Sequence, residues 1–166
     1  MNKTYFIILL TILFANTTFA QVSPQLENKK GNLPEILYYV NDFEGILSWE
    51  EVPIIDEKLE AYFKQSEHKI ILVTIPSIEP YEDIFNYSLD LAININTKQN
   101  KNAEIVIVIS KNLRQIQIQN IDQIREKLTD EETKNIIENF FIPEFKNDKY
   151  FTGIINGIEQ IKKELQ

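Results

Sequence analysis

Carboxylates are the side chains of this sequence whose chemistry is most open to a functional role. Asp42 and Glu44 lie in a polar segment at residues 41–45, and Asp130 lies at the expected start of a helix. Oxygen-rich groups of this kind suit hard divalent cations. We therefore predict that Asp42, Glu44 and Asp130 hold a metal ion, Ca²⁺ or Mg²⁺. The commoner structural explanations are a turn residue for Asp42 and a first-turn charge favoured by the helix dipole for Asp130.

Other catalytic and cofactor-binding patterns are missing from the sequence. His68 is the single histidine and there is no cysteine, so zinc ligation, thiolate chemistry and disulfides lack their residues. The four glycines are isolated and form no phosphate-binding loop. We expect no organic cofactor, and the sequence leaves the catalytic residues unknown.

Composition limits the partners. With 43% hydrophobic and 25% charged residues, a chain of 166 residues is globular and long enough for one domain with a proper core. Its formal charge is −8, and the basic residues are scattered. Excess negative charge disfavours a nucleic acid or an anionic membrane surface as the main partner.

The N-terminus has the pattern of a secretory signal. Lys3 precedes a nearly pure apolar run at residues 5–15, and the small residue Ala20 ends the pattern. We predict a signal peptide at residues 1–20, a flexible arm at 21–33 and one domain at 34–166. The protein is then exported, periplasmic or extracellular after cleavage near Ala20, with no transmembrane segment in the mature chain. An uncleaved N-terminal anchor is the alternative.

The rest of the chain is organised around residues 103–119. Residues 105–109 are an unbroken β-branched run, typical of a strand buried on both faces. Residues 115–119 alternate Gln and Ile, which predicts an antiparallel partner strand with the three Gln side chains on a wet face. Another apolar run at residues 69–75 precedes a helical pattern at 81–93. Strand, helix and strand predict a parallel βαβ unit with a right-handed crossover.

Four further helices are expected, and Ile121, Ile124 and Leu128 indicate a short one directly after the hairpin. A stripe of apolar residues runs to about Lys64. Thr129 and Glu132 have capping-box spacing, and the helix that they open is predicted to end before Pro143. The last helix begins near residues 147–148 and carries two glycines, which predict close packing against the sheet.

From Tyr39 to its end, the chain resembles the TPM domain, which occurs in thylakoid-lumen photosystem-repair proteins and many bacterial exported proteins. The resemblance rests on the order and spacing of several blocks, namely NDFEGILS at residues 41–48, the strand at 71–75, LTD at 128–130, IPEF at 142–145, NDKY at 147–150, and Gly153 and Gly157. It departs at three places where the family has glycines: residues 94–96, 102–103 and 121–123.

The resemblance implies a three-layer α/β/α domain with a small mixed sheet. It also implies two functions. One is a weak metal-assisted phosphatase, with Asp42 and Asp130 holding the cation. The other is a non-catalytic accessory module that binds an envelope or membrane protein. The replaced glycines and the missing general base favour the second function.

Overall fold

The β-branched run at residues 105–109 forms strand β3 (Ile105–Ser110), and all six of its residues are buried. The computed structural model describes residue 31 and residues 33–166. The predicted signal peptide and nearly all of the predicted arm therefore lie outside the described residues. Burial on both faces places β3 inside the sheet, as its sequence predicts.

The sheet has four strands in the order β1-β2-β3-β4. Their bounds are β1 Val40–Asp42, β2 Ile70–Thr74, β3 Ile105–Ser110 and β4 Gln115–Asn120. The first three strands run parallel, and β4 returns antiparallel to β3 through a hairpin. The predicted βαβ unit and the predicted hairpin are both confirmed.

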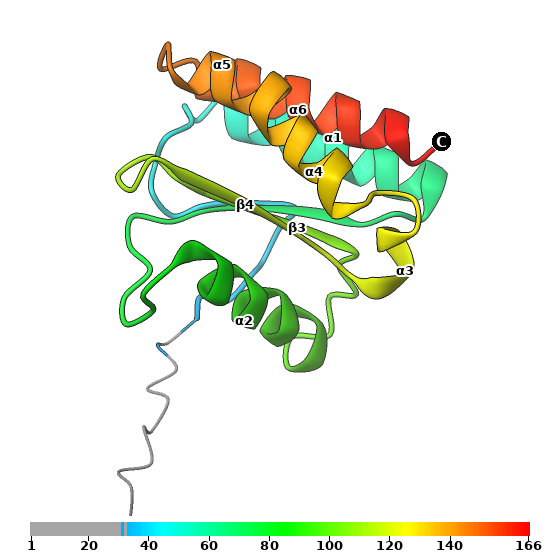
Figure 1. Cartoon of the computed structure of the whole chain (residues 1–166), viewed down its shortest axis with the longest axis horizontal. Coiled ribbons are helices and arrows are strands. Elements are labelled where there is room, and N and C mark those ends of the chain that lie inside the picture. The colour runs from blue at the N-terminus through cyan, green and yellow to red at the C-terminus, as the bar shows by residue number, and fades with distance from the viewer. Residues whose placement is uncertain (1–30, 32) are drawn as a thin grey trace, which may run out of the picture.

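Helices cover both faces of this sheet (Figure 1). Their bounds are α1 Glu51–Ser66, α2 Ile84–Thr97, α3 Asp122–Arg125, α4 Asp130–Ile136, the π-helical segment η1 Ile137–Phe141, α5 Ile142–Phe145 and α6 Tyr150–Glu164. Helix α2 lies on one face, and α1, α4, α5 and α6 lie on the other (Figure 1). The fold is the predicted three-layer α/β/α arrangement with a mixed sheet.

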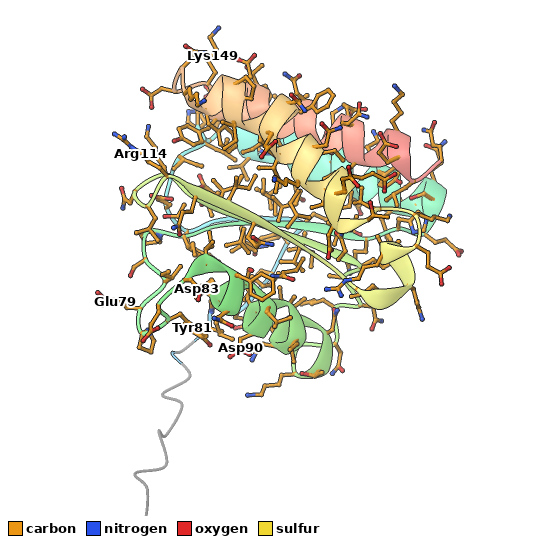
Figure 2. All side chains as sticks on the ribbon, in the orientation of Figure 1. Glu79, Tyr81, Asp83, Asp90, Arg114 and Lys149 are labelled. Atoms are coloured by element: carbon orange, nitrogen blue, oxygen red, sulfur yellow. The ribbon has the colours of Figure 1, made fainter. Side chains whose placement is uncertain are left out.

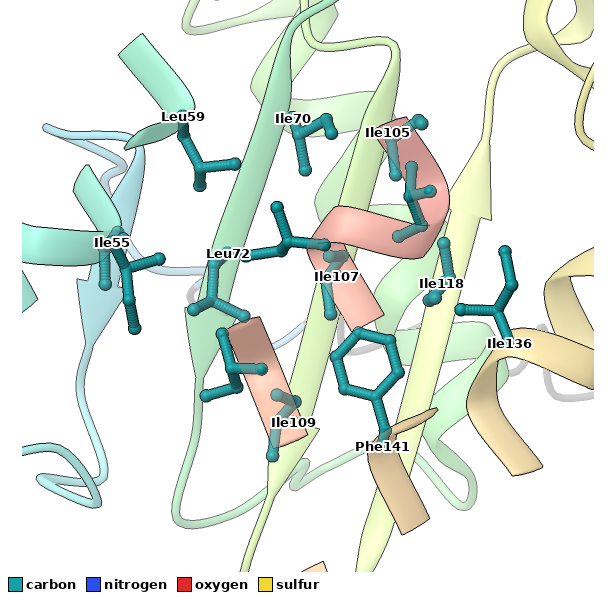
Figure 3. Close-up of a cluster of buried hydrophobic side chains, with 14 of the residues drawn as sticks. Ile55, Leu59, Ile70, Leu72, Ile105, Ile107, Ile109, Ile118, Ile136 and Phe141 are labelled. Atoms are coloured by element: carbon teal, nitrogen blue, oxygen red, sulfur yellow. The ribbon is translucent and has the colours of Figure 1, made fainter. Parts of the chain in front are cut away.

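Two hydrophobic clusters hold the layers together. The larger one joins the sheet to α1, α4 and α6, with Ile107, Phe141 and Ile154 fully buried (Figure 3). The smaller one packs Val106 and Val108 against Leu91 of α2. Successive residues of β3 therefore point into different clusters, as the period of two in a strand requires.

The wet face predicted for β4 is wrong at its far end. Gln119 is buried, because α2 covers that face of the sheet. Its Nε2 atom donates to Ser88 Oγ at 2.9 Å and to the Phe85 carbonyl at 3.3 Å. These two bonds satisfy the N–H donors of the buried amide, so a polar strand residue is accommodated at a helix–sheet contact.

The helix opened by Thr129 was predicted to end before Pro143, and this prediction is wrong. Helix α4 continues into η1 and then α5, which has Pro143 in its first turn. At the junction, the backbone N–H of Ile142 donates to the Ile137 carbonyl, five residues back. This π turn changes the hydrogen-bond register just ahead of Pro143, where the chain has no N–H to give. The helical path therefore extends to Phe145.

Helix α6 also begins later than predicted. It starts at Tyr150, and its N-cap residue Lys149 makes no side-chain cap bond. Its glycines face the α4–η1–α5 helix instead of the sheet. A Cβ atom on Gly157 would lie 1.9 Å from the Phe141 ring, and one on Gly153 would lie 2.7 Å from the Phe145 ring. The absence of a Cβ atom lets the helices approach this closely.

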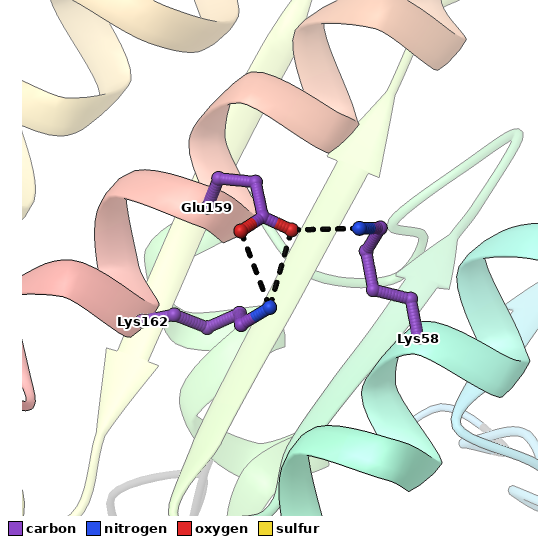
Figure 4. A network of polar contacts seen from close by, with 3 residues as sticks. All are labelled: Lys58, Glu159 and Lys162. Atoms are coloured by element: carbon purple, nitrogen blue, oxygen red, sulfur yellow. Dashed lines mark hydrogen bonds and ion pairs between the residues drawn. The ribbon is translucent and has the colours of Figure 1, made fainter.

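An ion-pair network joins α1 to α6 at the surface of the helical layer (Figure 4). Glu159 accepts from Lys58 at 2.9 Å and from Lys162 at 3.2 Å. Burial disfavours the charged form of Glu159, but the hydrogen bonds from the two lysines outweigh it and lower the pKa of its carboxyl.

No helix among residues 33–166 is both long and apolar enough to cross a membrane.

The predicted capping box at the start of α4 is confirmed. Thr129 Oγ1 accepts from the Glu132 N–H at 3.2 Å, and the Glu132 carboxylate accepts from the Thr129 N–H at 2.7 Å. Both bonds satisfy donors that the first helical turn leaves without an internal partner.

Replacing Thr129 with alanine is expected to lower the free energy of unfolding by about 1 kcal/mol, because the N-cap acceptor is lost. Urea denaturation measures the change. Thr152→Ala, at an exposed position inside α6, is the matched control and is expected to leave stability unchanged or slightly raised. Equal midpoints for Thr129→Ala and the unchanged protein would contradict the role of the cap.

Candidate functional site

Asp42 stands at the carboxyl end of β1 and organises the turn that follows. Its Oδ1 atom accepts from the Ile46 N–H at 3.1 Å and from the Thr74 hydroxyl, and its Oδ2 atom accepts from the Leu47 N–H at 3.0 Å. Thr74 ends the neighbouring strand β2. The carboxylate therefore ties two strand ends to the loop that leads into α1.

Glu44 continues this connection across the same edge of the sheet. Its two carboxylate oxygens accept from the backbone N–H groups of Lys111 at 2.8 Å and Asn112 at 2.7 Å. Its own N–H donates to Thr74 Oγ1 at 3.1 Å. Asp42 and Glu44 thus link β1, β2 and the β3–β4 hairpin at the carboxyl edge of the parallel strands.

Asp130 is not brought to this edge, which corrects the predicted site. Asp42 stands at the level of Thr74 and Ile109 in the sheet register, whereas β4 runs the other way and ends at Asn120, opposite Ile105. Asn120 then bonds to the segment that precedes α4. Because β4 is antiparallel, it carries the chain to the other end of the parallel strands, which we call the far edge, and Asp130 begins α4 there.

The residues present do not fit a resident divalent cation. Every carboxylate oxygen of Asp42 and Glu44 already accepts from an N–H or O–H donor, and these donors present positive charge where a cation would bind. Within the described part of the chain, no three His, Cys, Asp or Glu side chains are grouped to hold a metal ion. Bound Ca²⁺ or Mg²⁺ stays a prediction from the sequence, without a site that all three predicted ligands share.

A groove with a volume of about 640 Å³ opens at the same carboxyl edge. One wall is the β3–β4 hairpin and the other is the segment from α5 to the start of α6. Its lining residues are Ser110, Lys111, Asn112, Arg114, Gln115, Ile116, Ile142, Phe145, Lys146, Asp148 and Tyr150. Ligands of open α/β sheets bind outside the carboxyl ends of the strands, which is where this groove lies.

The charge of the groove differs from that of the protein. Lys111, Arg114 and Lys146 line it together with a single carboxylate, Asp148. Lys111 Nζ pairs with Asp148 at 3.3 Å and lies 5.0 Å from the centre of the Tyr150 ring. Within residues 33–166, Arg114 and Lys146 make no side-chain hydrogen bond or ion pair. A protein with a formal charge of −8 therefore has a locally positive groove.

Backbone geometry explains how short loops build the two walls. Arg114 (φ 53°) and Asp148 (φ 57°) both adopt the left-handed conformation, which closes the hairpin and the α5–α6 turn. Figure 2 shows Arg114 at the tip of the hairpin, reaching into solvent, with Lys149 at the neighbouring helical turn. The π turn in η1 precedes α5, which supplies the groove residues Ile142 and Phe145.

Aromatic packing supports the floor of the groove. The rings of Phe145 and Tyr150 stack with centroids 4.6 Å apart. Burial raises the pKa of the Tyr150 hydroxyl, and the nearby Lys111 charge opposes this shift only in part. The Tyr150 hydroxyl is therefore neutral at physiological pH.

Two other positions singled out in the sequence lie at the opposite end of the parallel strands. His68 is partly buried, and its Nδ1 atom lies 2.7 Å from a Glu104 carboxylate oxygen. At residues 121–123, where the resemblance would place a glycine-rich loop, Ile121 has φ −72° and is the N-cap residue of α3, which confirms the short helix predicted after the hairpin. That backbone needs no glycine, and it forms the start of a helix instead of an open loop.

The fold is that of a known domain class. A family model described as the TPM domain matches residues 40–164, so the chain belongs to the TPM domain family. The resemblance stated from the sequence is thereby confirmed. A search of curated proteins finds no match.

Solved structures agree on the fold. The chain is similar to the N-terminal domain of a P. gingivalis protein, with 22% identity and a TM-score of 0.69, over 77% of this chain and 82% of that one. It is also similar to the N-terminal domain of the cg2496 protein from Corynebacterium glutamicum, with 17% identity and a TM-score of 0.59, over 82% and 86%. A third similar structure is the BA42 protein from Bizionia argentinensis, with 19% identity and a TM-score of 0.61, over 74% of this chain and 83% of that one.

Proposed function

We propose that this TPM domain is an exported accessory module that binds an envelope or membrane protein and does not catalyse a reaction. Its binding surface is the groove between the β3–β4 hairpin and the α5–α6 segment. The observation that carries the proposal is that the carboxylates and the groove residues at this edge of the sheet have different roles. The carboxylates of Asp42 and Glu44 hold the loops in place. The groove beside them presents apolar surface and two cations, Arg114 and Lys146, that have no ion-pair partner among the described residues.

The groove lacks the parts of a hydrolytic site. Ser110 is the one serine that lines it. This residue is 1% exposed, and its Oγ atom accepts from the Leu113 N–H at 3.3 Å. The single histidine, His68, pairs with Glu104 in another part of the domain. The residues that line the groove therefore do not provide a nucleophile beside a base, as covalent catalysis requires.

Weak metal-assisted phosphatase activity is the second candidate. Asp42 supports it, since a carboxylate at the carboxyl end of a strand stands where sheet proteins commonly bind ligands. Against it stand the bonds that already occupy both Asp42 oxygens and the position of Asp130 at the far edge.

Export rests on the sequence pattern of Lys3, the apolar run at residues 5–15 and Ala20. A partner in the cell envelope follows from that location. The chain's excess negative charge supports a protein partner over a nucleic acid.

Hydrolysis of a phosphate monoester separates the two candidates. With excess Mg²⁺ or Ca²⁺, the purified protein is expected to show no turnover above a blank, and Asp42→Asn is expected to change nothing. Turnover that survives further purification and disappears in folded Asp42→Asn protein would establish the phosphatase and refute the proposal. Circular dichroism of the variant confirms that it is folded, because Asp42 has a structural role.

A further inference from the structure

We infer that the occupant of the groove is an extended acidic segment of a partner protein, added as a fifth strand beside β4 with its carboxylates on Arg114 and Lys146. This inference rests on the proposed function and names the chemistry of the partner. It combines three features of the groove: a free strand edge, an unpaired positive charge and an apolar floor.

The free edge is that of β4. Among the described strands, β4 stands last in the sheet, so only one of its sides is paired. At its start, Gln115 and Ile116 line the groove. The outer backbone groups of an edge strand are a ready template for another extended chain. Further along, the Ile118 carbonyl already accepts from Gln117 Nε2 at 3.2 Å, so free pairing capacity is concentrated near the groove.

The charge selects an acidic chain. Lys111 is already paired with Asp148, whereas Arg114 and Lys146 are exposed cations without a described ion-pair partner. Glu44 adds a second carboxylate at the hairpin, but both of its oxygens accept backbone N–H groups. Hydrogen bonds from Arg to a carboxylate are stronger than neutral ones and can be bidentate. Since the rest of the protein is acidic, this groove is where an acidic chain is attracted instead of repelled.

The floor accepts apolar side chains. Ile116, Ile142 and Phe145 are half-buried and line the groove. Side chains of a strand alternate between two sides. A segment that alternates acidic and β-branched residues would place one set on these apolar residues and the other set beside the cations. A groove of about 640 Å³ is within the range of natural ligand pockets.

Fluorescence anisotropy with a labelled short peptide of alternating Glu and Val tests the inference. Saturable binding is expected to the full protein, and Arg114→Gln is expected to weaken it about tenfold, the loss of one charge-assisted contact. Arg114→Gln with Lys146→Gln is expected to weaken it further. Lys127→Gln removes the same charge from an exposed position near α3, and it is the matched control with less than a twofold effect expected.

Comparison peptides test each component. A peptide of alternating Lys and Val is expected not to bind. Methylation of alternate backbone nitrogens in the acidic peptide is expected to weaken its binding about tenfold, because it removes strand pairing. Excess inorganic phosphate at constant ionic strength is expected not to displace the peptide. Displacement by phosphate, or an equal loss in Lys127→Gln, would overturn the inference. Tight binding of a neutral or basic peptide in this groove would overturn the acidic occupant but keep the proposed function. Absence of all peptide binding together with phosphatase turnover would overturn both.

Discussion

Replacing Asp42 with alanine is expected to lower the free energy of unfolding by about 3 kcal/mol. The substitution removes the acceptor of the Ile46 and Leu47 N–H groups and of the Thr74 hydroxyl. Hydrogen bonds to a charged acceptor stabilise more than neutral ones, and donors left without a partner add a desolvation cost. Urea denaturation followed by circular dichroism measures the change.

Asp130→Ala is the matched control for this prediction. Asp130 is exposed in the first turn of α4, and its side chain contributes mainly through the helix dipole. Its loss is expected to cost no more than about 0.5 kcal/mol. Asp42→Asn keeps one acceptor oxygen and is expected to fall between the two. Similar small losses for Asp42→Ala and Asp130→Ala would contradict the structural role of Asp42.

Gly157→Ala is expected to destabilise the protein by about 2 kcal/mol, although alanine is the better helix former. A Cβ atom there would lie 1.9 to 2.5 Å from three atoms of the Phe141 ring, and Phe141 is fully buried. Overpacking of this kind costs about 1–3 kcal/mol, which exceeds the gain of about 1 kcal/mol in helix propensity. Thermal unfolding is expected to show the midpoint lowered by about 6–10 °C.

A second substitution tests the mechanism of this loss. Phe141→Leu removes the ring, so Gly157→Ala is expected to cost less in that background than in the unchanged protein. Asn156→Ala, at the exposed neighbouring position of the same helix, is the control and is expected to be neutral or stabilising. Additive losses in the double variant would show that contact with Phe141 is not the cause.

Much of the fold could be predicted because its signals are local. The β-branched run of β3, the spacing of the βαβ unit and the Thr129 capping box each follow from residues close together in sequence. The errors come from tertiary context. Burial of Gln119 depends on where α2 packs, and the helical path through Pro143 depends on a π turn that no periodicity announces.

The candidate site was harder to predict than the fold. Asp42 and Glu44 could be singled out, but their role as loop ties required the positions of Thr74 and the hairpin. The sequence places Asp130 at the same site because its distance along the chain does not reveal that β4 ends at the opposite end of the sheet. The groove combines two loops about thirty residues apart. Its basic residues belong to two short polar segments that are distant in sequence. The sequence alone therefore shows them as scattered charges and not as one basic surface.

Mapping of amide chemical shifts tests the central claim, that the domain binds an acidic strand in the groove between the hairpin and the α5–α6 segment. The ¹⁵N-labelled protein is titrated with the peptide of alternating Glu and Val. Progressive shifts are expected at Lys111, Arg114 and Ile116 and across residues 142–150, with the far edge around Thr129 unchanged. Shifts concentrated near residues 121–130, or spread over the surface without saturation, would contradict the assignment of the groove.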